Sequence, residues 1–248
     1  MKIEKINFKN SRGLNLVGVL TKPDIDDKKN IIIISHGSAS NKDRPRLVKV
    51  SEKLCEAGFA SLRYDTGGSG GSEDAPVTVA NYTDDIKSAM KYIIDLGYSN
   101  LSLLGESLGG LSSILAYNKE IKSLVLWAPV TASKVPSILK DKQVEKDLEN
   151  KGYFLYRKDE KDFKFPKQYL EERTSINQEK ILSKIKCPVL IIQGTNDNTI
   201  PLEDSKKALK YLSKESRLEL IEGGIHSLNN KIDEIIPLTL NWFNKYLK

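Results

Sequence analysis

Residues 101–110 read Leu-Ser-Leu-Leu-Gly-Glu-Ser-Leu-Gly-Gly, an apolar run that leads into a serine, Ser107, flanked by glycines. The run predicts a β-strand, and the residues after Ser107 can open a helix. A strand, a sharp turn and a helix around one serine are typical of a nucleophile elbow, which lifts the serine hydroxyl out of the sheet. Gly-x-Ser-x-Gly is a weak signal alone because glycine and serine are common. The interpretation therefore depends on the rest of the chain.

A serine hydroxyl becomes a good nucleophile only when a neighbouring base takes its proton, and imidazole is the usual base. The chain has two histidines, His36 and His226, and each follows an apolar run that predicts a strand. Asp197 follows another such run and lies between Ser107 and His226 in the chain. Serine, aspartate and histidine therefore occur in the order in which an open α/β sheet can present a catalytic triad at its strand ends.

Each triad candidate also has an ordinary structural interpretation. Ser107 could cap a helix, Asp197 could form an Asx turn, and His226 could be a loop histidine. Together their order and positions favour a triad in which Ser107 attacks, His226 carries the proton and Asp197 orients the imidazole. The competing residues for the acidic position are Glu203, Asp204 and Glu222. Asp197 is preferred because it lies nearest to a predicted strand end after a glycine.

Negative charge on a reacting carbonyl oxygen requires N–H donors that are already in place. The residue after the nucleophile, Leu108, is the first expected donor. The second is expected from Ser38, in the loop that follows the run at 31–35. His36 lies in the same loop and is interpreted as a structural residue rather than a second base.

Short apolar runs alternate with longer helical patterns along most of the chain, which predicts an α/β fold. The expected strands are 3–8, 14–21, 30–35, 60–64, 101–104, 123–127, 189–193 and 217–221. The central runs are apolar throughout, as in parallel strands covered on both faces, whereas 14–21 alternates and favours an antiparallel edge strand. We therefore predict a mostly parallel eight-stranded sheet with helices on both faces, among them 45–57 and 81–96.

Residues 131–184 interrupt this alternation with a charged and aromatic stretch. Segments 153–157 and 162–165 can pair as a hairpin, and 144–151 and 168–173 have helical patterns. A long insertion in a compact domain is usually functional. We predict a cap over the active site at 131–184, with 1–130 and 185–248 forming the core. The cap aromatics that are candidates for substrate binding are Tyr153, Phe154 and Tyr169.

The composition limits the classes of partner. Net charge is +6, but the lysines are spread along the chain and form no basic stripe typical of nucleic-acid binding. No run of roughly eighteen apolar residues predicts a membrane span, and the expected location is the cytoplasm. Cys55 and Cys187 lack partners at metal-ligand spacing, so we expect structural thiols, no metal and no cofactor. A homodimer is compatible with the sequence.

A glycine-rich loop at 63–72 follows one predicted strand. Such loops can present backbone donors to a phosphate. This one lacks the Gly-Lys-Ser/Thr ending of a P-loop and the spacing of a dinucleotide fingerprint. A loop that supports the rim of the active site is the preferred interpretation.

Five motifs together resemble those of the α/β-hydrolase superfamily, and they span the chain apart from 131–184. They are His-Gly-Ser at 36–38, Arg-Tyr-Asp at 63–65 with its glycine-rich tail, Gly-Glu-Ser-Leu-Gly-Gly at 105–110, Gly-Thr-Asn-Asp at 194–197 and Glu-Gly-Gly-Ile-His at 222–226. Within the superfamily the chain is most similar to small bacterial feruloyl (cinnamoyl) esterases and serine-aminopeptidase-like hydrolases. Those proteins carry a cap between their sixth and seventh strands. The esterases often have histidine where this chain has Glu106.

The leading hypothesis is a carboxylic-ester hydrolase that forms an acyl-enzyme on Ser107 and acts on short acyl or hydroxycinnamoyl esters, with a small-molecule ester as its partner. An aminopeptidase or amidase would need cap carboxylates to hold the substrate amine. The candidates for that role are Glu145, Glu149, Glu171 and Glu172. Two further hypotheses for the same fold are a monoacylglycerol or lysophospholipid lipase and a non-catalytic ligand receptor.

Overall fold

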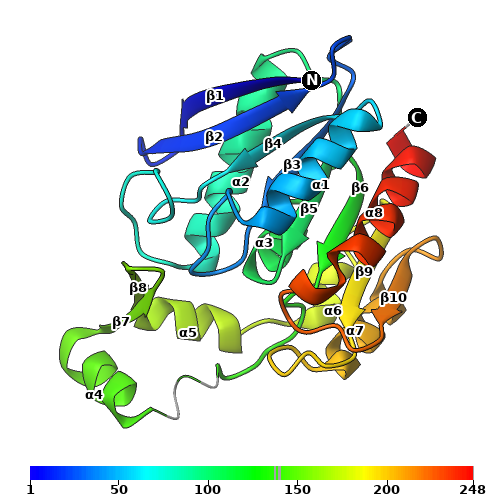
Figure 1. The fold of residues 1–248 in the computed structure, drawn as a ribbon. Helices are drawn as coiled ribbons and strands as arrows, with labels where there is room; N and C mark the ends of the chain where they lie inside the picture. The colour runs from blue at the N-terminus through cyan, green and yellow to red at the C-terminus, as the bar shows by residue number, and fades with distance from the viewer. Residues whose placement is uncertain (137, 139–140, 248) are drawn as a thin grey trace.

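The structure is a computed structural model that describes residues 1–136, 138 and 141–247, and these residues include an eight-stranded sheet (Figure 1). The strand order is β1-β2-β4-β3-β5-β6-β9-β10. Its strands are β1 (Lys2–Lys9), β2 (Asn15–Lys22), β3 (Asn30–Ser35), β4 (Ala60–Tyr64), β5 (Asn100–Glu106), β6 (Ile121–Trp127), β9 (Val189–Gly194) and β10 (Arg217–Ile221). The predicted mostly parallel α/β sheet is confirmed, with every predicted strand within about two residues of its expected position.

One strand position differs from the prediction. β2 is antiparallel, as expected, but it pairs with both β1 and β4 and is not at the edge of the sheet. The edge strand on this side of the sheet is β1, most of whose side chains are exposed. The alternation at 14–21 indicates a strand with one face more buried than the other. Such a strand can lie at the edge of a sheet or inside it, and the sequence pattern is the same in both cases.

Helices cover both faces of the sheet (Figure 1). The helices are α1 (Pro45–Glu56), α2 (Val79–Asp95), α3 (Leu108–Ala116), α6 (Gln178–Leu182), α7 (Leu202–Ala208) and α8 (Ile232–Leu247), with 3-10 turns η2 (Leu209–Tyr211) and η3 (Asn229–Lys231). Ile31 and Ile33 belong to the core under α2, while Ile32 and Ile34 belong to the core under α1 and α8. Each such side chain contributes about 1.5–3 kcal/mol on burial. This two-sided burial explains the uniformly apolar run. No described helix is long and apolar enough to cross a membrane.

Between β6 and β9 in the chain, α4 to α5 form a lobe beside the main sheet (Figure 1). It contains α4 (Lys142–Lys151), the antiparallel hairpin β7 (Tyr153–Lys158) and β8 (Lys161–Pro166), and α5 (Lys167–Thr174). The side chain of Asp141 caps the start of α4, and Gly152 ends it in a left-handed conformation. The hairpin and both helices lie where the sequence predicted them. The following helix, α6, packs against α3 and α7 of the core instead.

Candidate active site

Ser107 lies in a strained turn between β5 and α3, with a positive φ of 51°. A non-glycine residue rarely adopts this conformation, and it persists only where the surroundings hold it. Glycines permit the tight packing: a Cβ at Gly109 would lie 2.5 Å from the carbonyl oxygen of His36, and one at Gly105 would lie 2.6 Å from that of Gly109. The turn therefore has the geometry of the predicted elbow and holds the Ser107 side chain at the end of β5.

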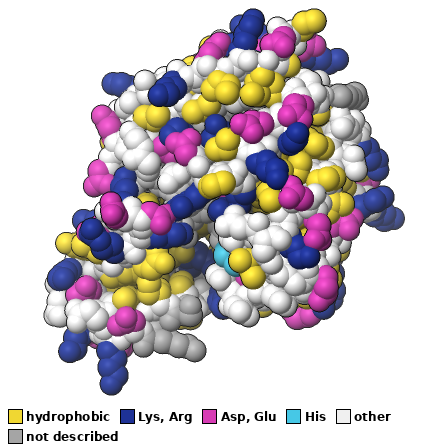
Figure 2. Space-filling model, in the orientation of Figure 1, with side chains coloured by type: hydrophobic (Ala, Val, Ile, Leu, Met, Phe, Trp, Pro, Cys, Tyr) yellow, Lys and Arg dark blue, Asp and Glu magenta, His cyan; other side chains and the backbone are white. Residues whose placement is uncertain are grey.

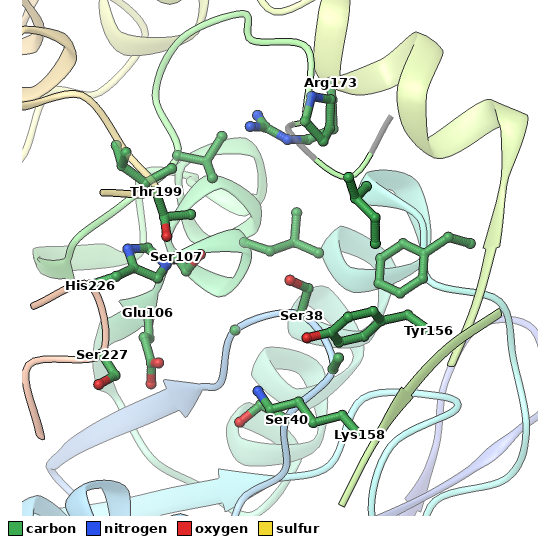
Figure 3. Close-up of a pocket in the computed structure, with 18 of the residues that line it drawn as sticks. Ser38, Ser40, Glu106, Ser107, Tyr156, Lys158, Arg173, Thr199, His226 and Ser227 are labelled. Carbon is green, nitrogen blue, oxygen red and sulfur yellow. Dashed lines mark hydrogen bonds between the residues drawn. The ribbon is translucent and has the colours of Figure 1, made fainter. Parts of the chain in front are cut away.

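The structure brings Ser107, His226 and Asp197 into one hydrogen-bonded series, and Figure 3 shows His226 beside Ser107. The Nε2 atom of His226 lies 3.1 Å from the Oγ of Ser107, and its Nδ1 lies 2.9 Å from Oδ2 of Asp197. Asp197 follows β9 and His226 follows β10, which are neighbouring parallel strands. Parallel strands end at the same edge of a sheet, so residues far apart in sequence meet there.

Asp197 is held as a carboxylate. Its side chain is 1% exposed, and burial alone would raise its pKa. The hydrogen bond with His226 and those from the backbone N–H groups of Ile200 and Thr199 outweigh burial and lower the pKa. The negative charge then favours the His226 tautomer with its proton on Nδ1, leaving Nε2 free to accept the Ser107 proton. The competing carboxylate Glu203 pairs with Lys206 instead.

His36 does not reach Ser107 in the described hydrogen-bond network. Its Nδ1 lies 2.7 Å from the carbonyl oxygen of Gly37, and its Nε2 accepts a hydrogen bond from the backbone N–H of Thr66. The side chain is fully buried, and burial lowers its pKa. A neutral imidazole with both nitrogens engaged fixes the loop after β3, so His36 has the structural position that the sequence indicated.

The two expected oxyanion donors both line the cavity next to Ser107. Leu108 is the first residue of α3, and a helix leaves its first N–H groups without intrahelical acceptors. Ser38 lies in the turn after β3, two residues from His36. Figure 3 shows Ser38 and Ser107 facing the same space.

A cavity of about 700 Å³ opens in front of Ser107 between the core and the lobe. Figure 2 shows the hollow, with a histidine at its rim and basic side chains around it. Alternate residues of β7 face it: Phe154, Tyr156 and Lys158. The Phe154 ring stacks on Phe165, and their centroids are 5.2 Å apart.

Two of the three predicted cap aromatics, Phe154 and Tyr169, line this cavity. Tyr153 does not line it, because neighbouring residues of a strand point to opposite faces. Its ring instead lies under the Lys164 ammonium, 4.1 Å from the centroid.

Sequence reasoning missed the charged side chains in the cavity wall. Arg46 and Glu106 are both almost buried and form a two-pronged ion pair, with Nε of Arg46 2.9 Å from Oε2 of Glu106. Arg46 also donates to Asn229. The remaining basic residues in the wall are Arg44, Lys134, Lys158 and Arg173. The available signal was a charged residue on an apolar helix face, since Arg46 is in phase with Val50 and Leu54.

The glycine-rich loop after β4 encloses its own carboxylates. Asp65 is fully buried and accepts hydrogen bonds from the backbone N–H groups of Lys42 and Gly71. The N–H of Gly67 donates to Asp85. Because these donors are occupied, the loop supports the neighbouring turns, and its geometry does not favour a phosphate site.

The described residues contain no cluster of metal ligands, and their two cysteines are not placed to react. No group of three or more His, Cys, Asp or Glu side chains in this part of the chain could hold a metal ion. Cys55 and Cys187 are free and buried, and burial raises the pKa of Cys187 to about 12. A protonated buried thiol is inert as a nucleophile.

The family model described as "Serine aminopeptidase, S33" matches residues 26–183. The chain belongs to this family. It is therefore a serine hydrolase with the α/β-hydrolase fold. The matched residues of this family member include Ser107, Ser38 and the whole lobe, and end before Asp197 and His226.

This serine aminopeptidase family member is similar to several named proteins. It is 28% identical to the human serine hydrolase BPHL over 210 residues, which cover 78% of this chain and 70% of that protein. It is 22% identical to the monoglyceride lipase homolog of monkeypox virus, over 84% of this chain and 85% of that protein. The solved structure of Est1E from Butyrivibrio proteoclasticus with bound ferulic acid has a TM-score of 0.83 and 25% identity, covering 97% of this chain and 98% of that one.

Proposed function

We propose that this chain is a carboxylic-ester hydrolase that forms an acyl-enzyme on Ser107. The observation that carries the proposal is the hydrogen-bonded series from Ser107 through His226 to Asp197, placed at the cavity. A nucleophile, a base and an orienting carboxylate in contact are the groups that acyl transfer requires.

In this mechanism the Oγ of Ser107 attacks the ester carbonyl carbon while Nε2 of His226 takes the hydroxyl proton. The N–H groups of Leu108 and Ser38 stabilise the resulting oxyanion. When the tetrahedral intermediate collapses, the C–O bond to the alcohol breaks and His226 protonates the leaving oxygen. Water then attacks the acyl-enzyme by the same steps, with His226 as its base, and releases the acid and Ser107. Asp197 stabilises the imidazolium formed in each half-reaction.

We also propose that residues 131–184 act as a cap. Support comes from the cavity wall, to which β7, β8 and α5 contribute Phe154, Phe165 and Tyr169. α6 packs on the core, so the covering role would fall to the parts of this insertion that line the cavity, which are the segment before α4, the hairpin and α5. The cap would exclude water and shape the acyl pocket.

The favoured substrates are short acyl or hydroxycinnamoyl esters. A cavity of about 700 Å³ is within the usual range for small-molecule sites. The stacked pair Phe154 and Phe165, with Tyr169 packed edge-on at 5.0 Å, offers flat apolar surface to an aryl or acyl group. The bound ferulic acid in Est1E supports the aryl option.

The charges in the cavity argue against an aminopeptidase. Among the described lining residues Glu106 is the one carboxylate, and Arg46 already pairs with it. Of the candidate amine-binding residues, Glu172 accepts hydrogen bonds from the backbone at the start of α2. None of the others lines the cavity, and they are Glu145, Glu149 and Glu171. A substrate ammonium would therefore meet basic side chains.

The test is hydrolysis of a p-nitrophenyl ester series from acetate to decanoate, beside methyl ferulate and an amino-acid p-nitroanilide. Ser107→Ala is the blank. We expect ester turnover that disappears in the variant and is highest for short acyl chains or the ferulate. Anilide turnover with little ester turnover would support the aminopeptidase, and a maximum at decanoate would support the lipase. A folded wild type that turns over none of these esters and is not labelled by a fluorophosphonate would support the non-catalytic receptor.

A further inference from the structure

Arg173 is a buried cation in the cavity wall with one unused donor. It lies on α5 with 4% of its surface exposed, and its Nη1 atom is buried without a hydrogen-bond partner. It forms no ion pair with any described residue. Leaving a charged donor buried and unpaired destabilises the folded protein. A buried donor without a partner calls for an explanation, and a bound anion is one that fits a cation in a cavity wall.

The surroundings of Arg173 are rich in donors. Tyr169 lies one helical turn earlier; burial raises its pKa, although the charge of Arg173 and a side-chain hydrogen bond with it act in the opposite direction. Lys134 lines the same cavity and donates to the carbonyl oxygen of Thr199 at 2.7 Å. The carboxylate of Asp204 interacts electrostatically with Lys134 and Arg173, but it does not line the cavity. An anion placed here would meet donors, and the one carboxylate among the described lining residues, Glu106, is already paired with Arg46.

Other basic residues of the wall differ from Arg173 in how they are satisfied. Arg46 pairs with Glu106, and Arg44 pairs with Asp159. Lys158 has no ion pair with a described residue, but it is only half-buried, so water can solvate it. Figure 3 shows Arg173 and Lys158 at opposite ends of the cavity. Arg173 is therefore the basic side chain in the described wall that has both burial and an unused donor.

We propose that Arg173 binds a carboxylate carried by the ester substrate, so that the preferred substrates are anionic esters such as half-esters of dicarboxylic acids. This inference rests on the proposed esterase function. The planar guanidinium can present two N–H donors to the two oxygens of one carboxylate. Arg173 is 4% exposed, and the lower dielectric of a buried position strengthens the interaction relative to the surface.

The first experiment compares p-nitrophenyl half-esters of dicarboxylic acids from glutarate to suberate with the same esters methylated at the free carboxyl group. We expect wild type to show kcat/KM at least tenfold higher for the anionic member at one chain length. Arg173→Gln should lower this anionic-to-neutral ratio at least tenfold. Arg157→Gln is the matched control, since it removes one positive charge from the exposed side of the hairpin, outside the cavity lining. It should keep the wild-type ratio.

A second comparison places the charge on the alcohol side, using 4-acetoxybenzoate against phenyl acetate. A preference for the anion in either comparison that depends on Arg173 supports the inference. If neutral esters are preferred in both, or if Arg173→Gln keeps the anionic preference, Arg173 does not bind substrate. Should Arg173→Gln fail to fold, adipate is tested as a competitive inhibitor of neutral-ester turnover by wild type at constant ionic strength, and absence of inhibition overturns the inference.

These results separate the inference from the proposed function. If wild type hydrolyses neutral esters through Ser107 but discriminates against carboxylates, the proposed esterase function stands and the inference of an anionic substrate is wrong. If wild type hydrolyses no ester and is not labelled by a fluorophosphonate, both the proposed function and the inference are wrong.

Discussion

Arg46 and Glu106 form a buried two-pronged ion pair across 60 residues of sequence, and Glu106 directly precedes the serine of the elbow. Replacing Arg46 with Met should leave the Glu106 carboxylate buried without a counter-charge, and the free energy of unfolding should fall by about 3–5 kcal/mol. The double variant Arg46→Met/Glu106→Gln should restore most of that loss. Urea unfolding of the two single variants and the double variant measures this coupling, and additive losses would contradict it.

Asp197→Asn should lower kcat by roughly four orders of magnitude, because a neutral amide no longer fixes the His226 tautomer or stabilises its cation. Combining it with Ser107→Ala should add little, since the three residues act as a unit. Ester hydrolysis gives the rates. Glu203→Gln is the matched control, because Glu203 pairs with Lys206 on the surface and should change kcat less than about twofold. An equal loss in both variants would mean that the acidic partner is misassigned.

His36 should make stability depend on pH. Burial lowers the pKa of His36, so the folded protein keeps it neutral while the unfolded chain takes up a proton below about pH 6.5. The free energy of unfolding should therefore fall as the pH decreases from 6.5 towards the lower folded pKa, by up to about 1.4 kcal/mol per pH unit. His36→Asn should flatten this slope. Urea unfolding at several pH values checks it, and an unchanged slope would show that other groups cause it.

Gly109→Ala should disturb the elbow. The new methyl group would lie 2.5 Å from the carbonyl oxygens of Ser35 and His36, so the backbone must move. We expect a loss of about 1–3 kcal/mol in stability and a lower kcat, because Ser107 and the Leu108 N–H shift with the turn. Gly71→Ala is the control, since its methyl group meets Val17 at an ordinary 3.6 Å. Similar thermal stability and kcat in the two variants would contradict this account.

Tyr156→Ala should weaken binding of aryl esters while Leu155→Ala should not. The two residues are neighbours on β7, but Tyr156 lines the cavity and Leu155 is 54% exposed on the other side. Loss of one aromatic contact of about 0.5–1.5 kcal/mol predicts a two- to tenfold rise in KM for methyl ferulate. Equal effects on KM would place the ester elsewhere.

The strands were predictable because burial leaves a direct record in sequence. Ile31 to Ile34 alternate between two cores, so all four had to be apolar. Ser107 was recognisable from its glycines, since only residues without a side chain fit around it. The order of Ser107, Asp197 and His226 followed from the rule that parallel strands end at one edge.

The charged wall of the cavity was not predictable in the same way. Arg173 lies on the same helix face as Tyr169 and Leu170, and its phase indicates burial. Its missing partner is a property of three-dimensional packing, which no local pattern records. Likewise Arg46 meets Glu106 only because α1 passes beside the end of β5. The order of the strands β1 and β2 was missed for the same reason, because pairing depends on distant segments.

The reactive groups and the walls of the cavity come from different parts of the chain. Ser107, Asp197 and His226 follow strands of the main sheet, whereas Phe154, Tyr156 and Arg173 belong to a lobe that contributes no strand to that sheet. Sequence changes in this lobe can therefore alter which ester is bound while the bond-breaking apparatus keeps its geometry. Natural sequence change, or the exchange of the hairpin and α5 for those of a relative, can therefore change the substrate preference of such an enzyme without changing its catalytic residues.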